Sequence, residues 1–262
     1  MTSQTRIDKG MYWQRALTLV EGCTAVSDGC DHCWAAQASH MRSFQKGEKI
    51  HTRHEGLTRS TPRVPMQPIL EWGEIPPEVE YYFAPAFNGI VRPQWDALDL
   101  PLHVKKPTTF AVWNDLFHED VPKAFIGEAL RVMDLCKEHR FLLLTKRARR
   151  MGLYVQWYGM RNVWLGVTAE NQKMACLRLP YLERCDTDNR WVSVEPMLSA
   201  VDLQEWLPHL GWVVCGPETG KHKRPCNPAW IEDLYEQCKA AGVPFFDKRK
   251  VGWLAREMPE GV

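Results

Sequence analysis

The sequence lacks three features that would each indicate a definite class of protein. Its 262 residues contain no uninterrupted run of 18 apolar residues, so we expect no membrane-spanning helix. The first residues, MTSQTRIDKGMYWQ, include no apolar stretch of signal-peptide length, so we expect a cytoplasmic protein. Charge of one sign is not in excess, since 33 Lys and Arg stand against 32 Asp and Glu, for a net charge of +1. Any nucleic-acid binding must therefore come from local clusters of basic residues.

A fourth clustered cysteine is missing as well. The nine cysteines are an odd number scattered along the chain, which favours free thiols in a reducing compartment. Cys23, Cys30 and Cys33 lie together in GCTAVSDGCDHCWA, and the next cysteine is Cys136. A closed zinc site needs four ligands, so His32 or a distant residue would have to complete it. A [4Fe–4S] cluster held by three thiolates would instead leave one iron open to a reacting ligand.

From about residue 102 onward, short apolar runs alternate with helical segments. Continuous apolar runs are typical of strands buried on both faces. Apolar residues at helical spacing follow in PKAFIGEALRVMDLCKEH and in PAWIEDLYEQCKAAG, which ends at Gly242. Strands and helices in series predict an α/β fold with a parallel sheet, either open or curled into a barrel. The runs are TTFAVWN, FLLLT, NVWLGVT, WVSVE, WVVCG and VPFFD, and an earlier strand around ALTLVEG leads into the cysteines.

Two segments fall outside this alternation. Residues 45–101 are rich in proline, charge and aromatic side chains, as in STPRVPMQP and EIPPEVEYYFAPAF. We interpret them as an irregular insertion after the first helix, either a plain surface excursion or a lid that shapes the substrate site. Residues 240–262 hold the last strand and a tail. We expect one domain over residues 1–262.

Polar residues follow nearly every predicted strand. In parallel strand–helix folds the chemistry lies at the carboxyl ends of the strands, so residues in those positions gather around one site. Their concentration at so many strand ends predicts a single cavity shared with the cysteines. These residues are Asn114, Asp115, Lys146, Arg147, Thr168, Glu170, Glu195, Gly216, Glu218 and Lys248.

Taken together, the motifs resemble the radical S-adenosylmethionine (radical SAM) superfamily, and most closely a phage-associated branch of uncharacterised proteins similar to spore photoproduct lyase. The matching segments are GCTAVSDGCDHCWA, NDLFHEDVP, LLLTKRARRM, NVWLGVTAENQ, VSVEPML and AGVPFFDKR, in the expected order. The resemblance implies a partial (β/α) TIM-like barrel of about six parallel strands. It also implies a [4Fe–4S] cluster that binds S-adenosylmethionine (SAM) and, with one electron from a flavodoxin- or ferredoxin-type donor, cleaves it. The resulting 5′-deoxyadenosyl radical would abstract a hydrogen atom from the substrate.

The resemblance assigns the cluster ligands to Cys23, Cys30 and Cys33, although the gap between the first two is longer than is usual in the superfamily. The residue before the last cysteine is usually aromatic and lies near the adenine. Here His32 holds that position and Trp34 follows the cysteine, so either ring could stack on the adenine.

The remaining cofactor residues follow from the strand ends. Asn114 and Asp115 stand where the superfamily binds the SAM ammonium group, and their oxygens suit N–H donors. Thr168 and Glu170 are placed to hold ribose hydroxyls, although a carboxylate before a helix is also a natural helix cap. Glu195 faces the same cavity, with SAM or substrate as its partner. The predicted cofactor-binding residues are His32, Trp34, Asn114, Asp115, Thr168, Glu170, Glu195 and Gly216.

Three basic clusters, KRARR, KHKR and DKRK, come directly after strands and should ring the mouth of the cavity. Phosphate contacts from such a rim, with tryptophans for stacking, suit a DNA or nucleotide substrate. A base in a duplex reaches a buried radical only when it is flipped out of the stack. The plainer interpretation is that these charges form solvated faces. The predicted substrate-binding residues are Lys146, Arg147, Glu218 and Lys248.

The phage setting of the similar proteins favours an isomerase or rearrangement step on a thymine-derived base, during hypermodification of phage DNA in an infected bacterial host. A first alternative is a DNA-lesion lyase of the spore photoproduct lyase type, in which Cys215 would donate a hydrogen atom. Core packing is the ordinary role of such a cysteine. A second alternative is a metal-binding module without radical chemistry, in which the cysteines only fasten the first loop.

Overall fold

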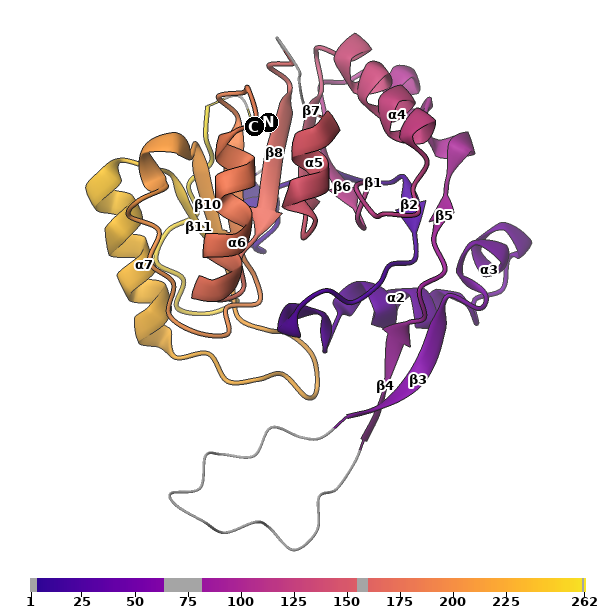
Figure 1. Ribbon diagram of the computed structural model, residues 1–262, viewed down its shortest axis with the longest axis horizontal. Helices are drawn as coiled ribbons and strands as arrows, with labels where there is room; N and C mark the ends of the chain where they lie inside the picture. Colours follow the sequence, from indigo (N-terminus) through magenta and orange to yellow (C-terminus); the bar gives the residue numbers. More distant parts are fainter. Residues whose placement is uncertain (1–3, 64–81, 155–159, 261) are drawn as a thin grey trace, which may run out of the picture.

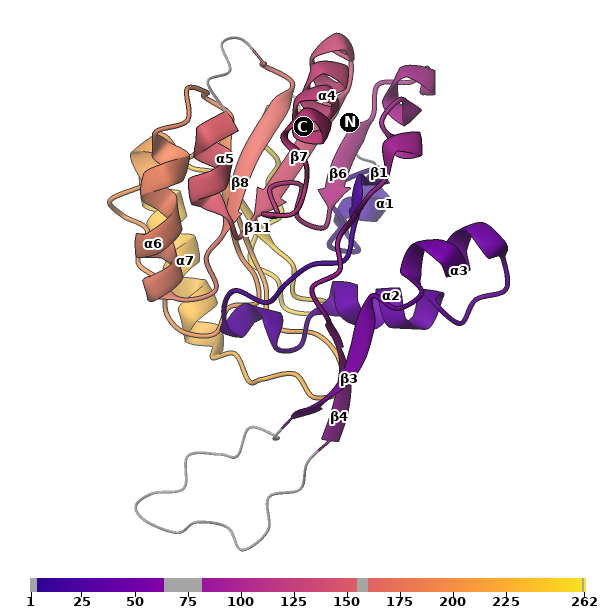
Figure 2. The same cartoon turned by 45° about the vertical axis from the view of Figure 1, so that its right-hand side comes forward.

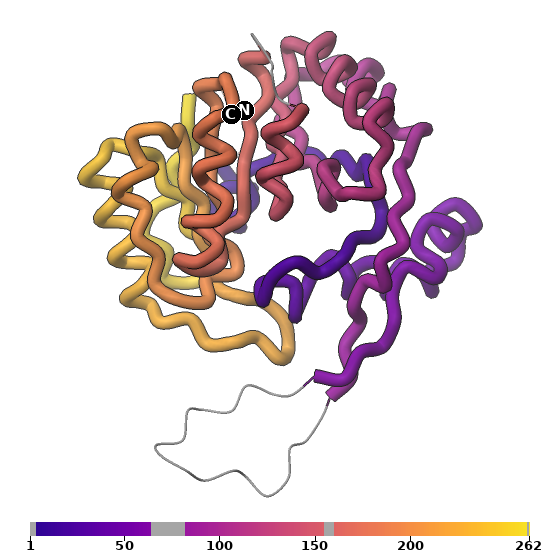
Figure 3. Tube along the Cα trace, in the orientation of Figure 1, coloured from indigo at the N-terminus to yellow at the C-terminus, as the bar shows by residue number. Residues whose placement is uncertain are grey.

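In a computed structural model of the chain, which describes residues 4–63, 82–154, 160–260 and 262, seven strands form one parallel sheet (Figure 1). Their order in the sheet is their order in the chain. The sheet curls around its concave face without closing, so that β1 and β11 are its two edges (Figure 3). The strands are β1 (Arg15–Thr18), β6 (Thr109–Trp113), β7 (Arg140–Thr145), β8 (Val163–Thr168), β9 (Arg190–Val194), β10 (Trp212–Cys215) and β11 (Phe245–Asp247). The predicted α/β fold with a curled parallel sheet is confirmed, with seven strands where about six were expected.

Four helices cover the convex face of this sheet: α4 (Lys123–Leu135), α5 (Ala148–Tyr154), α6 (Gln172–Glu183) and α7 (Pro228–Ala241) (Figures 1 and 2). The end of α7 at Gly242 is confirmed, since Gly242 has φ of 69° in the left-handed region that caps a helix. The side chain of Asn171 caps α6 by accepting from the Met174 N–H. Glu170, which the sequence offered as a cap, does not do this.

The concave face is filled by large aromatic side chains. Tyr12, Trp191, Trp212 and Phe246 pack there in a cluster separate from the core beneath the helices. At Gly166 on β8 a Cβ atom would lie 2.4 Å from the Trp191 indole, so only glycine leaves room for that ring. These rings occupy the inside of the half-barrel, and Tyr12 and Trp191 form the floor of a cavity near the carboxyl ends of the strands.

The insertion is more regular than the sequence predicted. Within residues 45–101 the described part contains α3 (Glu48–His54), an antiparallel hairpin of β3 (Thr58–Arg63) and β4 (Tyr82–Phe87), and β5 (Arg92–Pro93), which pairs with β2 (Val20–Glu21). Residues 64–81 of the insertion lie outside the described residues. The hairpin and α2 (Trp34–Arg42) lie beyond the carboxyl ends of the strands (Figure 2). This placement allows the lid role that the sequence left open.

The first described helix lies against the tail that follows β11. The short helix α1 (Gln4–Ile7) is tied to the tail after β11, because the Arg256 guanidinium donates to the Ile7 carbonyl over 2.8 Å. None of the helices in the described ranges is long and apolar enough to cross a lipid bilayer.

Candidate functional site

A cavity of about 960 Å³ opens at the carboxyl ends of the strands. Its wall includes all three clustered cysteines and residues at or just after the carboxyl ends of six of the seven strands of the sheet. This volume is at the upper end of the range for small-molecule sites. The predicted site residues that line it are Cys23, Cys30, Cys33, Trp34, Asn114, Asp115, Lys146, Arg147, Thr168, Glu195, Glu218 and Lys248. The sequence prediction that cysteines and strand ends share one cavity is therefore confirmed for these residues.

Four predicted site residues lie outside this lining. Glu170 and Cys215 have no exposed surface, and His32 and Gly216 are held by neighbouring side chains.

The cysteine loop, residues 22–33, begins at a backbone position that only glycine can occupy. Gly22 has φ of 85°, and a Cβ atom there would lie 1.9 Å from the Ile90 carbonyl oxygen. The close approach fixes the direction in which the chain leaves β2 toward Cys23. At the other end of the loop, Cys33 takes the N-cap position of α2. Burial raises the pKa of the Cys33 thiol, while hydrogen bonding from the Ala36 N–H works in the opposite direction.

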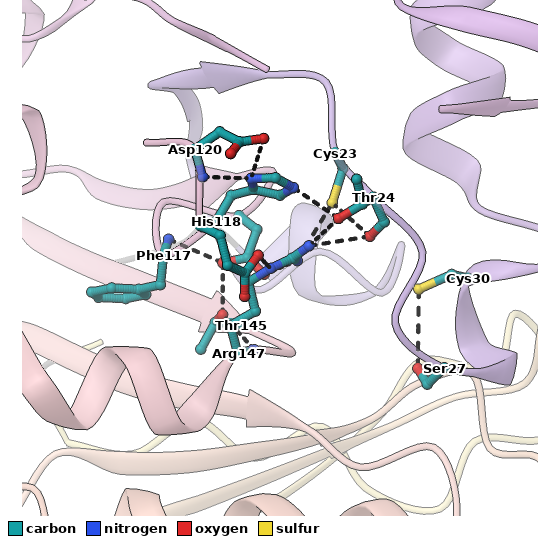
Figure 4. A network of polar contacts seen from close by, with 11 residues as sticks. Cys23, Thr24, Ser27, Cys30, Phe117, His118, Asp120, Thr145 and Arg147 are labelled. Atoms are coloured by element: carbon teal, nitrogen blue, oxygen red, sulfur yellow. Dashed lines mark hydrogen bonds and ion pairs between the residues drawn. The ribbon is translucent and has the colours of Figure 1, made fainter. Parts of the chain in front are cut away.

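The first cysteine is held by an arginine from the loop after β7. The Arg147 guanidinium contacts Cys23 Sγ at 3.7 Å, Asp115 at 2.9 Å and Glu119 at 2.5 Å. It also donates to the carbonyl and the hydroxyl of Thr24, at 3.3 and 2.5 Å. Figure 4 shows the guanidinium directed at Cys23 and Thr24, with Cys30 well apart on the same loop. Burial, with the charge of Asp115, raises the pKa of the Cys23 thiol to about 12 even though Arg147 acts to lower it.

The predicted ammonium site is largely occupied by the protein itself. Asp115 Oδ1 accepts from the Thr145 hydroxyl and the Phe117 N–H, and Oδ2 accepts from Arg147. Asn114 has φ of 62°, and its amide nitrogen donates to the Val20 carbonyl over 2.7 Å. The Asp115 carboxylate therefore holds Arg147, Thr145 and the Phe117 backbone in place. Of the two residues, Asn114 is the better candidate acceptor for an ammonium group.

Glu170 does not reach the cavity, because it lies beneath the cysteine loop. Its carboxylate accepts from Arg178 over 2.6 Å, and Gly29 packs directly against it. Burial alone would raise the pKa of Glu170, but the positive charges of Lys146 and Arg178 outweigh this effect and lower the pKa. The predicted contact with ribose hydroxyls is thus left to Thr168, which does line the cavity.

Glu195 and Lys248 form an ion pair on the cavity wall, with Glu195 Oε1 and Lys248 Nζ 2.6 Å apart. The ammonium group of Lys248 also lies over the rings of Tyr12 and Trp13, at 5.5 and 5.8 Å from their centroids. Gly216 supports the pair from behind, since a Cβ atom there would come within 3.0 Å of the Lys248 Cβ. The glycine acts through Lys248 rather than by lining the site.

His32 is fixed by partners on both ring nitrogens. Nδ1 lies 2.7 Å from Glu218, and Nε2 lies 2.5 Å from the hydroxyl of Tyr82 on β4. Arg224 pairs with the same Glu218 carboxylate, and the Tyr82 ring stacks on His222 at 3.8 Å. The hairpin and the loop after β10 are thereby joined to the cysteine loop, and Glu218 is already paired within the protein.

Three free thiols line this cavity, and no described partner closes them into a metal site. Over the described ranges, no group of three or more His, Cys, Asp or Glu side chains is arranged to hold one ion. Cys23, Cys30 and Cys33 are free thiols that line the same cavity. His32 could complete a zinc site only by losing Glu218 or Tyr82.

Cys215 is fully buried in β10, where its Sγ lies 3.6 Å from the Met197 sulfur. It does not line the cavity, which agrees with the ordinary role of a packed cysteine.

Sequence reasoning gave no role at the site to Arg178 or Thr24, and it placed Arg224 only within the basic cluster KHKR. Arg178 and Arg224 pair with the carboxylates below and beside the cysteine loop, and Thr24 links Arg147 to the loop. His118 bonds Thr24 over 2.8 Å. No spacing along the chain marks these partners, because only the folded chain brings the two members of each pair into contact.

A family model described as "Protein of unknown function (DUF5131)" matches residues 9–261 of the chain. The matched range includes the cysteine loop and every strand of the parallel sheet. No curated protein and no solved structure matches the chain.

Proposed function

Because the chain belongs to the DUF5131 family, described only as proteins of unknown function, we propose an activity from the chemistry of the cavity: a radical SAM enzyme that acts on a DNA base. The observation that carries the proposal is the cavity itself, in which three free cysteines face polar residues from the ends of successive parallel strands. When bound there, a [4Fe–4S] cluster would supply the electron that splits SAM into methionine and a 5′-deoxyadenosyl radical.

In this proposal the protein positions the cofactor with few groups. Cys23, Cys30 and Cys33 would hold three irons of the cluster and would leave the fourth for SAM. Trp34, which is 51% exposed and lines the cavity, replaces His32 as the ring for the adenine, because His32 does not line the cavity. Thr168 provides a hydroxyl at the place proposed for the ribose.

The substrate side of the cavity suits one planar base. Trp13 and Trp113 line the wall beside Trp34 and pack edge to face against each other, with ring centroids 6.5 Å apart, so that the wall is largely aromatic. Exposed lysines at the rim, Lys223 and Lys250, suit the phosphates of a nucleic-acid backbone. A cavity of about 960 Å³ has room for a nucleoside-sized cofactor and a single base but not for a duplex, so the base would enter flipped out or from a single strand.

Between the candidate reactions, the burial of Cys215 favours the isomerase or rearrangement on a modified, thymine-derived base. A lyase of the spore photoproduct type needs a hydrogen-donating cysteine beside the substrate, and Cys215 is sealed behind Met197. An external electron donor of flavodoxin or ferredoxin type and a phage-infected bacterial host remain part of the same proposal.

The test is anaerobic reconstitution with iron and sulfide, followed by analysis of SAM products with dithionite as the electron source. We expect a bound cluster and 5′-deoxyadenosine from the unchanged protein, and neither from Cys30→Ala. Cys176→Ala is the matched control, because Cys176 is an exposed free cysteine outside the cavity lining. Loss of cluster and product in both variants, or zinc in place of iron, would overturn the proposal.

A further inference from the structure

We propose that Arg147 is a positioning residue for the first cluster ligand, which holds Cys23 in place and sets a positive charge against its sulfur. This inference rests on the proposed function and replaces the substrate contact that the sequence predicted for Arg147.

All five N–H groups of the Arg147 guanidinium already have partners within the protein. Nε donates to Glu119, Nη1 to Asp115 and to Cys23 Sγ, and Nη2 to the two oxygens of Thr24. An arginine has five such donors, so none is left for a phosphate of the substrate. The residue is only 6% exposed, and a buried guanidinium of this kind is bound to its site by its acceptors.

The partners of Arg147 are themselves fixed. The Thr145 hydroxyl donates to Asp115 Oδ1 over 2.6 Å, and the Phe117 N–H donates to the same oxygen over 3.0 Å. The hydroxyl of Thr24 is held from its other side by His118 Nε2 at 2.8 Å. The first part of the cysteine loop is therefore braced by the loops after β6 and β7 before any ligand is present (Figure 4).

The other two cysteines are held differently. Cys30 Sγ has a weak contact at 4.0 Å with the Ser27 hydroxyl, and Cys33 is placed by the backbone of α2. Among the hydrogen-bond contacts of these three sulfurs in the described residues, the guanidinium of Arg147 is the one that brings a formal charge. A cation beside a thiolate ligand stabilises the more negative, reduced state of a cluster, so it raises the reduction potential.

The two effects, rigid placement and charge, can be separated with two substitutions. Arg147→Lys keeps the positive charge but has three donors instead of five, whereas Arg147→Gln loses the charge as well. Arg149→Gln is the control, because Arg149 is an exposed arginine on α5 just beyond the site.

The first measurement is amide hydrogen exchange in the protein without iron, for peptides that cover the cysteine loop. Exchange there should be about tenfold faster in both Arg147 variants than in the control, since a charge-assisted bond network is lost. The second measurement is the midpoint potential of the reconstituted cluster. It should shift to more negative values in Arg147→Gln and stay close to the unchanged protein in Arg147→Lys.

Equal exchange rates and equal potentials in all forms would overturn the inference. If Arg147→Gln does not fold, Thr24→Val takes its place for the exchange measurement, because it removes one acceptor of the guanidinium and keeps the loop sequence otherwise intact. Failure of the unchanged protein to hold a cluster would instead refute the proposed function, and the exchange data on the iron-free protein would still decide the positioning role.

Discussion

Gly29 in the cysteine loop lies directly on the carboxylate of Glu170, so that a Cβ atom at position 29 would be 3.0 Å from the Glu170 carboxyl carbon. The contact joins the middle of the loop to the buried Glu170–Arg178 ion pair at the end of β8. The loop that carries the ligands is therefore seated on a charge pair that has no exposed carboxylate surface.

Replacing Gly29 with alanine should force the loop away from Glu170. Overpacking of this kind costs about 1–3 kcal/mol of unfolding free energy, and here it should also lower the iron content after reconstitution. Gly127→Ala is a control with the opposite expected sign, because nothing lies within 4 Å of a Cβ at this position within α4, and it should gain about 0.5–1 kcal/mol. Urea unfolding and iron analysis check both variants, and an unaffected Gly29→Ala protein would contradict this account of the loop.

Glu21, which precedes the loop, should make stability fall with rising pH. Burial raises its pKa from 4.5 to about 7, more than the charges of Arg42 and Arg53 lower it. The contribution of Glu21 to the unfolding free energy is fully present below pH 4.5 and is lost as the pH rises through about 7. From the size of the pKa shift, the unfolding free energy should fall by about 3 kcal/mol over this interval.

The measurement for Glu21 is the unfolding free energy of the unchanged protein and of Glu21→Gln, compared across this pH interval. The Gln variant should lose much less stability than the unchanged protein. Glu55→Gln, at an exposed position, should follow the unchanged protein. Parallel curves for the unchanged protein and Glu21→Gln would show that Glu21 is ionised throughout.

The ion pair of Glu195 and Lys248 should matter for binding more than for stability. Both side chains are partly exposed, at 25 and 21%, so the pair adds about 1 kcal/mol or less to folding. Lys248→Met leaves the Glu195 carboxylate unpaired on the cavity wall and should weaken SAM binding about tenfold. The double variant with Glu195→Gln should recover part of this loss in a double-mutant cycle measured by calorimetry. Strictly additive effects would mean that the two residues act independently.

Trp34 should contribute through its aromatic face. Stacking on one base is worth about 1–3 kcal/mol, so Trp34→Ala should weaken SAM binding about ten- to hundredfold, while Trp34→Phe keeps most of the affinity. Trp253→Ala is the control, since Trp253 is 44% exposed but does not line the cavity. If Trp34→Ala instead weakens only the binding of single-stranded DNA, the Trp34 ring contacts the substrate and not the adenine of SAM.

The sequence was sufficient to predict the parallel sheet and the cavity at its carboxyl edge, because apolar runs mark buried strands and the residues just after them must gather at one edge. It did not predict which polar side chains would pair with one another. Arg147 and Glu218 were expected to face a substrate, yet each is paired within the protein by Asp115 and Arg224 respectively. Such partners are 32 and 6 residues away along the chain, and only the folded loops bring them together.

The central claim is that one iron of the cluster has no protein ligand and binds SAM. Electron paramagnetic resonance of the reduced cluster, recorded with and without SAM, tests this most directly. We predict that SAM changes the spectrum of the unchanged protein and of Cys176→Ala. A spectrum that SAM leaves unaltered, or a metal site of zinc closed by a fourth side chain, would contradict the account.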